Sequence, residues 1–346
     1  MRVPDELERA LYAAVGDVPR DLARAIVERS RRYTSERDRL AAPAGRDDLA
    51  ARALFFTIAD AMKVTVPLRE LAARGALPVR PKVVDLGAGC GAMTLGLLTM
   101  LPDASVLAID RDRAALAIAQ AAARELGVTI ETRTGDVSTC DIPRCDLVVM
   151  GSVLNELAPA AQVAVVERAL AAIDSNGAVI VVEPALRETA RALHAVRDAA
   201  IASGRGHVFA PCTRRVAPCP MLADPDDWCH EDRPLELPPR TRELARLTHL
   251  RDSGMKFAYL TLRRAPLDLV DDPAAWRIVS APRPSKGKLE IFGCSAAGRV
   301  PLRLLKRHRS DANRELERAD RGDVVSIDGP ELVAETRVVR VPRDRS

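Results

Sequence analysis

The residues best suited to chemistry in this 346-residue chain form a glycine-rich turn directly after a short apolar run. The segment reads VVDLGAGCGA over residues 83–92, and its glycines let the backbone approach a ligand closely because they lack Cβ. A dinucleotide or S-adenosylmethionine could use such a turn, and Asp110, at the end of the next predicted strand, would bind ribose hydroxyls in either case. Asp85 distinguishes between these two ligands, because a carboxylate repels the pyrophosphate of a dinucleotide and attracts the ammonium of S-adenosylmethionine. The turn therefore favours S-adenosylmethionine.

Polar residues at the ends of the following predicted strands extend this site. Gly135 and Asp136 follow the third strand, and the fourth strand runs into residues 151–157, the region that faces the methyl group in class I methyltransferases. The span 82–183 resembles the core of class I methyltransferases, in which an acid after the third strand commonly lies near the adenine. Asp110 and Asp136 have an alternative role as helix N-caps or turn residues. The predicted cofactor contacts are Asp85, Gly87, Ala88, Gly89, Gly91, Asp110, Arg111, Asp136, Val137 and Ser152.

The sequence contains less evidence for catalysis than for binding. Amino-directed methyltransferases of nucleic acids often carry an Asn/Asp-Pro-Pro-aromatic run after the fourth strand, whereas this chain has Ser-Val-Leu-Asn at 152–155. Asn155 and Glu156 are the candidate catalytic residues in this region. They could equally cap or orient the next helix, so the identity of a proton acceptor stays open.

Four of the seven cysteines occur in a pattern that favours a metal centre. Three cysteines lie among apolar core residues, a common setting for a small buried thiol: Cys90, Cys140 and Cys145. The other four are Cys212, Cys219 and Cys229 in one aperiodic loop, and Cys294 at the end of a later predicted strand. A loop has little core to fill, so thiols gathered there indicate a soft metal site.

The spacing of these four cysteines leaves the kind of metal centre open. Structural zinc usually draws on paired C-x₂₋₄-C knuckles, and the separations between Cys212, Cys219 and Cys229 are longer. A [4Fe–4S] cluster takes four thiolates from more widely spread positions and suits the pattern better. His207 and His230 keep a Cys₃His zinc site as the alternative.

The elements that must position these residues predict an α/β fold with a Rossmann-like class I methyltransferase sheet. Apolar residues at helical spacing predict an N-terminal helical cap over residues 1–78. Short apolar runs alternating with helices predict a cofactor-binding core over 79–203, with strands at 82–86, 105–110, 128–133, 146–151 and 178–183. We expect a cysteine-rich metal-binding insertion at 204–240, remaining core strands within 241–285 (256–262 and 276–280), and a small β-rich C-terminal module around one helix at 286–346.

Taken together, these features resemble one known family. The most specific segments are Pro-Cys-Pro at 218–220, Asp-Trp-Cys-His at 227–230 and Lys-Phe-Ala-Tyr-Leu at 256–260. Over about residues 50–310 the chain resembles the mitochondrial small-ribosomal-subunit methyltransferase-like family and its bacterial relatives. The resemblance implies an S-adenosylmethionine pocket, binding to the small ribosomal subunit during its assembly, and a [4Fe–4S] cluster on Cys212, Cys219, Cys229 and Cys294.

The chain departs from this family at three places. The family usually has a shorter link with His and Gly between the first two cysteines, where this chain has TRRVAP at 213–218. An aromatic residue typically follows the Trp-Cys-His run, and Glu231 stands there instead. Residues 63–67 read KVTVP, where the family usually carries an Ala-Thr-Tyr run after a proline. The departures weaken inferences about a specific partner surface more than they weaken the cluster assignment.

Charge gives modest support for RNA as a partner. With 52 basic and 48 acidic residues the net charge is +4, so affinity for nucleic acid would need a local patch. A basic stretch of this kind contains Arg303, Lys306, Arg307 and Arg309, and Arg214 and Arg215 add charge to the cysteine-rich loop. Two Trp, three Tyr and five Phe are too few for an extensive base-stacking surface.

The chain start and the hydropathy predict the cellular setting. Acidic residues occur within the first ten positions, and no apolar run approaches the length of a membrane span, so we expect a cytoplasmic monomer without membrane contact. Two other functions stay open. One is a non-catalytic ribosome assembly factor with the same fold, which the missing proline-aromatic motif suggests. The other is a small-molecule methyltransferase with a structural zinc site in the cysteine-rich loop.

Overall fold

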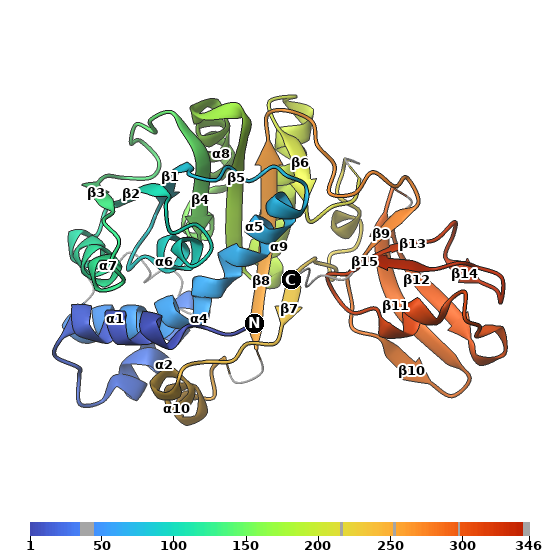
Figure 1. The fold of residues 1–346 in the computed structure, drawn as a ribbon, viewed down its shortest axis with the longest axis horizontal. Helices are drawn as coiled ribbons and strands as arrows, with labels where there is room; N and C mark the ends of the chain where they lie inside the picture. Colours follow the sequence, from blue (N-terminus) through green and yellow to red (C-terminus); the bar gives the residue numbers. More distant parts are fainter. Residues whose placement is uncertain (35–44, 215–216, 252–253, 297, 342–346) are drawn as a thin grey trace.

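The N-terminal part of the chain is helical in the computed structural model, which describes residues 1–34, 45–214, 217–251, 254–296 and 298–341 (Figure 1). Its elements are α1 (Asp5–Val15), α2 (Leu22–Thr34), α3 (Arg46–Ala51), η2 (Arg52–Thr57), α4 (Ile58–Asp60), η3 (Ala61–Val64) and α5 (Thr65–Ala73). From α3 to α5 the backbone is helical without interruption, with a π-helical stretch at η2 and a 3₁₀ turn at η3. Leu7, Leu11 and Ile26 are buried, as the helical spacing of apolar residues predicts.

An eight-stranded mixed sheet follows, with the order β3-β2-β1-β4-β5-β8-β6 and with β7 paired to β8. The strands are β1 (Lys82–Leu86), β2 (Ser105–Asp110), β3 (Glu131–Thr134), β4 (Cys145–Gly151), β5 (Ile173–Pro184), β6 (His207–Ala210), β7 (Glu231–Arg233) and β8 (Met255–Arg263). Strands β1 to β5 are parallel, whereas β8 runs antiparallel to β5, β6 and β7. The predicted α/β fold is confirmed, although β3 begins at Glu131 rather than at residue 128.

Helices cover both faces of this sheet, which explains the continuous apolar runs in its central strands. These helices are α6 (Ala92–Leu98), α7 (Arg113–Glu125), α8 (Pro159–Ala172) and α9 (Arg187–Ala202), whereas α10 (Pro239–Thr248) packs against α1, α2 and η2. One apolar core includes residues of α6, α7 and the N-terminal helices, and a second core includes residues of α8 and α9. The strand order reverses between β1 and β4, so the carboxyl ends of these strands form the edge where doubly wound sheets bind ligands.

A second sheet of seven strands contains the C-terminal part of the chain, at the right of Figure 1. Its strands are β9 (Ala275–Ile278), β10 (Arg283–Ser285), β11 (Lys288–Ser295), β12 (Gly298–Leu305), β13 (Val324–Ser326), β14 (Glu331–Leu332) and β15 (Val339–Val341). Strand β9 pairs with β11 and β13 in this second sheet. The prediction that residues 276–280 form a strand of the methyltransferase-like core is therefore wrong. Short 3₁₀ segments, Lys306–His308 and Arg314–Arg318, occupy the region where a helix was predicted.

A buried charged network connects the second sheet to the first. The guanidinium of Arg277, on β9, donates to Glu70 Oε1 (2.9 Å), to Glu231 Oε1 (2.7 Å) and to the Tyr259 hydroxyl (3.0 Å). Arg233 donates to the other carboxylate oxygen of Glu231 (2.9 Å). Charges buried in this way are tolerated because each has a partner, and loss of one partner would leave another charge unpaired. Residues from α5, β7, β8 and β9 are therefore held together at one point.

No helix in the described ranges is both long and apolar enough to cross a membrane.

Candidate functional site

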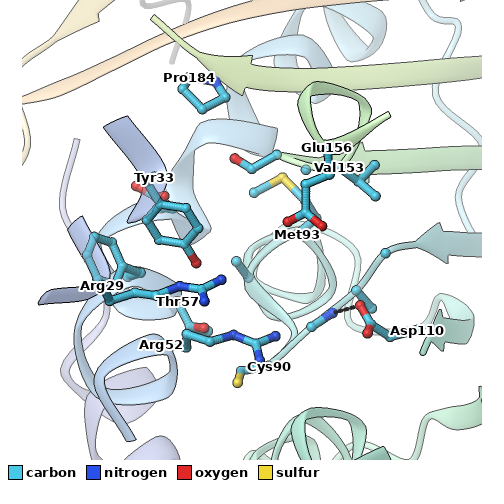
Figure 2. Close-up of a pocket in the computed structure, with 18 of the residues that line it drawn as sticks. Arg29, Tyr33, Arg52, Thr57, Cys90, Met93, Asp110, Val153, Glu156 and Pro184 are labelled. Atoms are coloured by element: carbon cyan, nitrogen blue, oxygen red, sulfur yellow. Dashed lines mark hydrogen bonds between the residues drawn. The ribbon is translucent and has the colours of Figure 1, made fainter. Parts of the chain in front are cut away.

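A cavity of about 690 Å³ lies at the carboxyl ends of β1 to β5. The glycine-rich turn and the loops after β2, β3 and β4 form one side of it. The opposite side comes from α2 and η2, whose Arg29, Tyr33, Arg52 and Thr57 are drawn at the left of Figure 2. This is the usual ligand position in a doubly wound sheet, and the volume is typical of a pocket for a cofactor-sized ligand.

The glycine-rich turn is locked to the end of β2. The amides of Gly87 and Ala88 donate to Ile109 O, and the amide of Gly89 donates to Asp110 Oδ2 (2.8 Å). The other oxygen of Asp110 accepts from the Asp112 amide (2.8 Å). Gly87 has φ +74°, and a Cβ there would lie 2.4 Å from Val153 Cγ2, so only glycine fits. The turn, Asp110 and the loop after β4 consequently form one preorganised surface.

Asp85 lies beneath this turn and does not line the cavity. Its Oδ2 accepts from the backbone amide (3.0 Å) and the hydroxyl (2.6 Å) of Thr94, near the start of α6. Its Oδ1 is buried with no hydrogen-bond partner among the described residues, and burial raises the pKa of the Asp85 carboxyl to about 7. The predicted direct contact with a cofactor ammonium is therefore absent from this geometry. The carboxylate points to α6 because alternate residues of a strand face opposite sides of the sheet, and α6 covers the side that Asp85 faces.

The loop after β4 is fixed from below by Glu183, at the end of β5. Its Oε1 accepts from the amides of Val153 (3.1 Å) and Leu154 (3.0 Å), and burial raises the pKa of Glu183 to about 7. Ser152 has φ +57°, an uncommon conformation for a non-glycine residue that this hydrogen bonding holds in place. The loop is thus shaped by a buried acid that the sequence analysis did not select.

Glu156 is the one candidate catalytic residue that lines the cavity. Its side chain is 26% exposed and lies 3.1 Å from Arg111, and burial raises the pKa of the Glu156 carboxyl although that guanidinium opposes the shift. Asn155 is not among the lining residues, and it hydrogen-bonds to Glu183 instead. A carboxylate with a raised pKa at a cavity wall can accept a proton from a bound group.

Most predicted cofactor contacts come together around this cavity. Those that line it are Gly87, Ala88, Gly89, Asp110, Arg111, Asp136, Val137 and Ser152. Gly91 does not, because it faces α7, where a Cβ would lie 2.9 Å from Ala119 Cβ. Asp110 and Asp136 also act as turn residues, which was their predicted alternative role. Asp110 accepts from the Asp112 amide (2.8 Å), and Asp136 accepts from the Ser138 amide (2.7 Å).

Several lining residues were missed because they come from distant elements. Arg52, on η2, lies 2.6 Å from Asp112, the N-cap residue of α7, and Arg29 stacks over the Tyr33 ring at 4.4 Å. Lys63, Arg251 and Lys256 line the far end of the cavity, beyond β5. No sequence pattern identifies these residues as lining a cavity, because charged residues are frequent in this chain. Only the folded structure shows which of them face the cavity.

The four cysteines selected from the sequence line one small cavity of about 50 Å³ between α9, β8 and the second sheet: Cys212, Cys219, Cys229 and Cys294. Burial raises the pKa of the Cys219 thiol to about 11 and of the Cys294 thiol to about 12. Cys212 Sγ accepts a hydrogen bond from Arg197 Nε (3.3 Å). His230 also lines this cavity and stacks on Trp228, whereas His207 does not line it.

Within the described residues, no group of three Cys, His, Asp or Glu side chains lies close enough together to hold a single metal ion. The four cysteines are thus related by the one cavity that they line. The other three cysteines are buried or half-buried in the main core, and Cys90 also lines the large cavity.

Comparisons with known proteins bear on the family. No curated protein matches this sequence. Among solved structures, magnesium protoporphyrin IX methyltransferase from Synechocystis PCC 6803, with bound SAM, is 15% identical, with 72% of this chain and 100% of that chain covered and a TM-score of 0.40. The ribosomal protein L11 methylase from Lactobacillus delbrueckii subsp. bulgaricus is 14% identical, with 59% and 80% covered and a TM-score of 0.38. Similarities this low carry no functional argument.

The sequence match is more extensive. Residues 51–326, most of the chain, match the family described as "Mitochondrial small ribosomal subunit Rsm22". The matched span contains the glycine-rich turn, the cavity loops, all seven cysteines and the strands that join the two sheets. The resemblance found in the sequence is confirmed, and the chain belongs to the Rsm22 family.

Proposed function

We propose that this chain is an S-adenosylmethionine-binding, methyltransferase-like protein that acts on or with the small ribosomal subunit and its RNA and carries a [4Fe–4S] cluster. The observation that carries the proposal is the hydrogen bond between the glycine-rich turn and Asp110, both of which line a cavity of about 690 Å³. The name of the Rsm22 family supports the link to the ribosomal small subunit.

The residues around the turn fit the cofactor. Asp110 would hold the ribose hydroxyls, since both of its oxygens are already oriented by backbone amides. Asp136 and Val137 would border the adenine, and Ser152 would face the methionine part, with Gly87, Ala88, Gly89 and Arg111 completing the site. Asp85 acts on the cofactor indirectly in this proposal, by fixing Thr94 and thereby the start of α6.

Methyl transfer would depend on the loop after β4. S-adenosylmethionine supplies an electrophilic methyl group when bound, and the protein must orient an acceptor and remove a proton. Glu156 is suited to accept this proton because it lines the cavity and burial raises the pKa of its carboxyl. The Glu183 contacts to Val153 and Leu154 would keep this loop in position during the reaction.

The second cavity fits an iron–sulfur cluster better than a single ion. Four thiols, three from the loop between β6 and β7 and one from β11, surround one buried space with apolar neighbours such as Met221 and Val279, and the described residues offer no tight single-ion site. A [4Fe–4S] cluster is larger than an ion and takes one thiolate at each of four irons. Cys212, Cys219, Cys229 and Cys294 would hold it, and it would connect the 204–240 segment to β11 of the second sheet.

Calorimetric titration with S-adenosylmethionine tests the cofactor proposal. Asp110→Ala should weaken binding about tenfold or more, because it removes charged hydrogen bonds to the ribose and frees the turn. Asp103→Ala is the matched control, since that exposed acid lies at the opposite ends of the strands. Equal affinity for both variants and the native chain would refute this site.

Metal analysis after anaerobic purification tests the cluster. The native protein should be brown and contain about four irons per chain, whereas Cys219→Ser should lose most of the iron. Cys140→Ser is the control, since this half-buried thiol belongs to the main core. A colourless protein with one zinc per chain would refute the cluster and favour the zinc alternative.

Mapping of methylated nucleotides in small-subunit RNA, with and without the gene, separates an enzyme from an assembly factor. A modification that returns with the native chain but not with Glu156→Gln supports catalysis. An unchanged modification pattern together with binding to small subunits in co-sedimentation supports an assembly factor instead.

A further inference from the structure

The large cavity extends well past the residues proposed to hold the cofactor. The strand order places the glycine-rich turn and Asp110 on one side of β4, and β5 and β8 on the other. Pro184, Ala185 and Leu186 line this second end after β5, and Leu250 lines it after α10. Figure 2 likewise draws Pro184 apart from Cys90 and Asp110. An acceptor must occupy this end if the cofactor occupies the first.

Three cations line this end against one carboxylate. The ammonium of Lys63, on η3, lies 2.8 Å from Asp60 Oδ1, and Arg251 Nη2 lies 3.2 Å from the same oxygen. Lys256, on β8, is half-exposed and pairs outside the cavity with Asp232 at 3.5 Å. Asp60 alone cannot neutralise both Lys63 and Arg251, so this end of the cavity keeps an excess of positive charge.

The neighbouring acid does not cancel this excess. Glu183 lies within electrostatic range of Lys63, but its Oε1 is committed to backbone amides after β4, and burial raises its pKa to about 7. It is therefore a weak counterion near neutral pH. No other acid among the described lining residues lies at this end, because Asp110, Asp112, Asp136 and Glu156 follow β2, β3 and β4.

Lys63 and Arg251 also occupy costly positions. The Lys63 side chain is only 3% exposed, and a charge buried to that degree is unfavourable unless it is fully paired. Arg251 has φ +60°, which is strained for a residue other than glycine, and its buried Nε has no hydrogen-bond partner among the described residues. A ligand anion would give a second partner to these two groups, which share Asp60.

We propose that Lys63, Arg251 and Lys256 form a phosphate-binding subsite for the methyl acceptor, so that the acceptor is a nucleotide rather than a neutral small molecule. This inference rests on the proposed function, because it assigns the other end of the cavity to S-adenosylmethionine. A nucleotide carries a phosphate beside the reacting base, and a guanidinium with an ammonium is a strong donor set for phosphate oxygens. A neutral acceptor would leave the positive charge uncompensated.

The test uses the full-length protein saturated with S-adenosylhomocysteine, so that the probes cannot enter the cofactor end. Cytidine, cytidine 5′-monophosphate and a cytidine trinucleotide are titrated and followed by calorimetry or by ³¹P line broadening. The monophosphate should bind about tenfold more tightly than the nucleoside, as expected for a pair of charge-assisted hydrogen bonds. Arg251→Gln and Lys63→Met should each remove most of this difference. Lys82→Gln, the same kind of charge loss on an exposed residue at the opposite end of β1, should not.

The outcomes are distinct. Equal binding of cytidine and its monophosphate, or a difference that survives Arg251→Gln, overturns the subsite. If Lys63→Met does not fold, Arg251→Gln carries the test, because that side chain is 29% exposed and Asp60 keeps Lys63 as a partner. Tighter binding of the trinucleotide than of the monophosphate supports the subsite with RNA as the phosphate source, and the reverse supports it with a free nucleotide. Failure of S-adenosylhomocysteine to bind would refute the proposed function itself, before any phosphate is added.

Discussion

Replacement of Asp85 by asparagine should change the pH dependence of stability in a defined direction. Burial raises the pKa of this carboxyl from 3.8 to about 7, although the hydrogen bonds from Thr94 oppose the shift. A carboxyl whose pKa is raised by folding stabilises the protein below its unfolded pKa, and this contribution is lost as the pH rises through the folded value. The native chain should therefore lose stability from this residue between about pH 4 and pH 7.

The size of the effect follows from the same shift. Between pH 5 and pH 8 the contribution of Asp85 to stability changes only over the two pH units from pH 5 to pH 7. At about 1.4 kcal/mol per pH unit, the free energy of unfolding of the native chain falls by about 3 kcal/mol. Asparagine keeps an oxygen to accept from Thr94 and cannot ionise, so it removes this pH dependence. Its amide group replaces Oδ1, for which the described part of the chain offers no partner, and the unpaired N–H costs about 1–3 kcal/mol at every pH.

Urea unfolding of both proteins at pH 5 and pH 8 measures the prediction. The free energy of unfolding of Asp85→Asn, relative to the native chain, should rise by about 3 kcal/mol from pH 5 to pH 8. Glu183 titrates in the same range but is common to both proteins, so its contribution cancels. The affinity for S-adenosylmethionine should change far less than in Asp110→Ala, because Asp85 does not line the cavity. A relative stability that is the same at both pH values would refute the assignment of a buried, largely protonated carboxyl.

Two further variants probe the turn and the contact between the sheets. Gly87→Ala places a Cβ 2.4 Å from Val153 Cγ2 at φ +74°. The affinity for the cofactor, measured by calorimetry, should fall at least about tenfold, while circular dichroism should show that the fold is retained. An unchanged affinity would contradict the proposed site. Arg277→Met leaves the half-buried Glu70 and the buried Glu231 without a shared partner, and urea unfolding should show a loss of about 3–5 kcal/mol. A loss below about 1 kcal/mol would mean that the network does not stabilise the contact.

The sequence by itself determined the local parts of this protein. The parallel strands follow from short apolar runs, since strands buried on both faces need apolar residues throughout. The turn at 83–92 follows from residue type, because glycine allows a close approach of the backbone, and Asp110 could be selected because it ends the next apolar run. Cys212, Cys219 and Cys229 could be grouped because thiols in an aperiodic loop have little core to fill, and Cys294, at the end of a later predicted strand, could be added as the fourth thiol.

Only the tertiary structure decided which distant groups meet. Asp85 satisfies the cofactor pattern in sequence, yet its side chain points beneath the turn to Thr94, since alternate residues of a strand face opposite sides. Strand β9 has an ordinary apolar pattern, and nothing in that pattern specifies its pairing with β11 and β13. Asp60 and Lys63 are neighbours in sequence and pair locally, whereas Arg251, 188 positions after Lys63, reaches the same carboxylate only through tertiary packing. Local propensity and periodicity act over a few residues, whereas the charge of a cavity is the sum over every element that the fold brings to it.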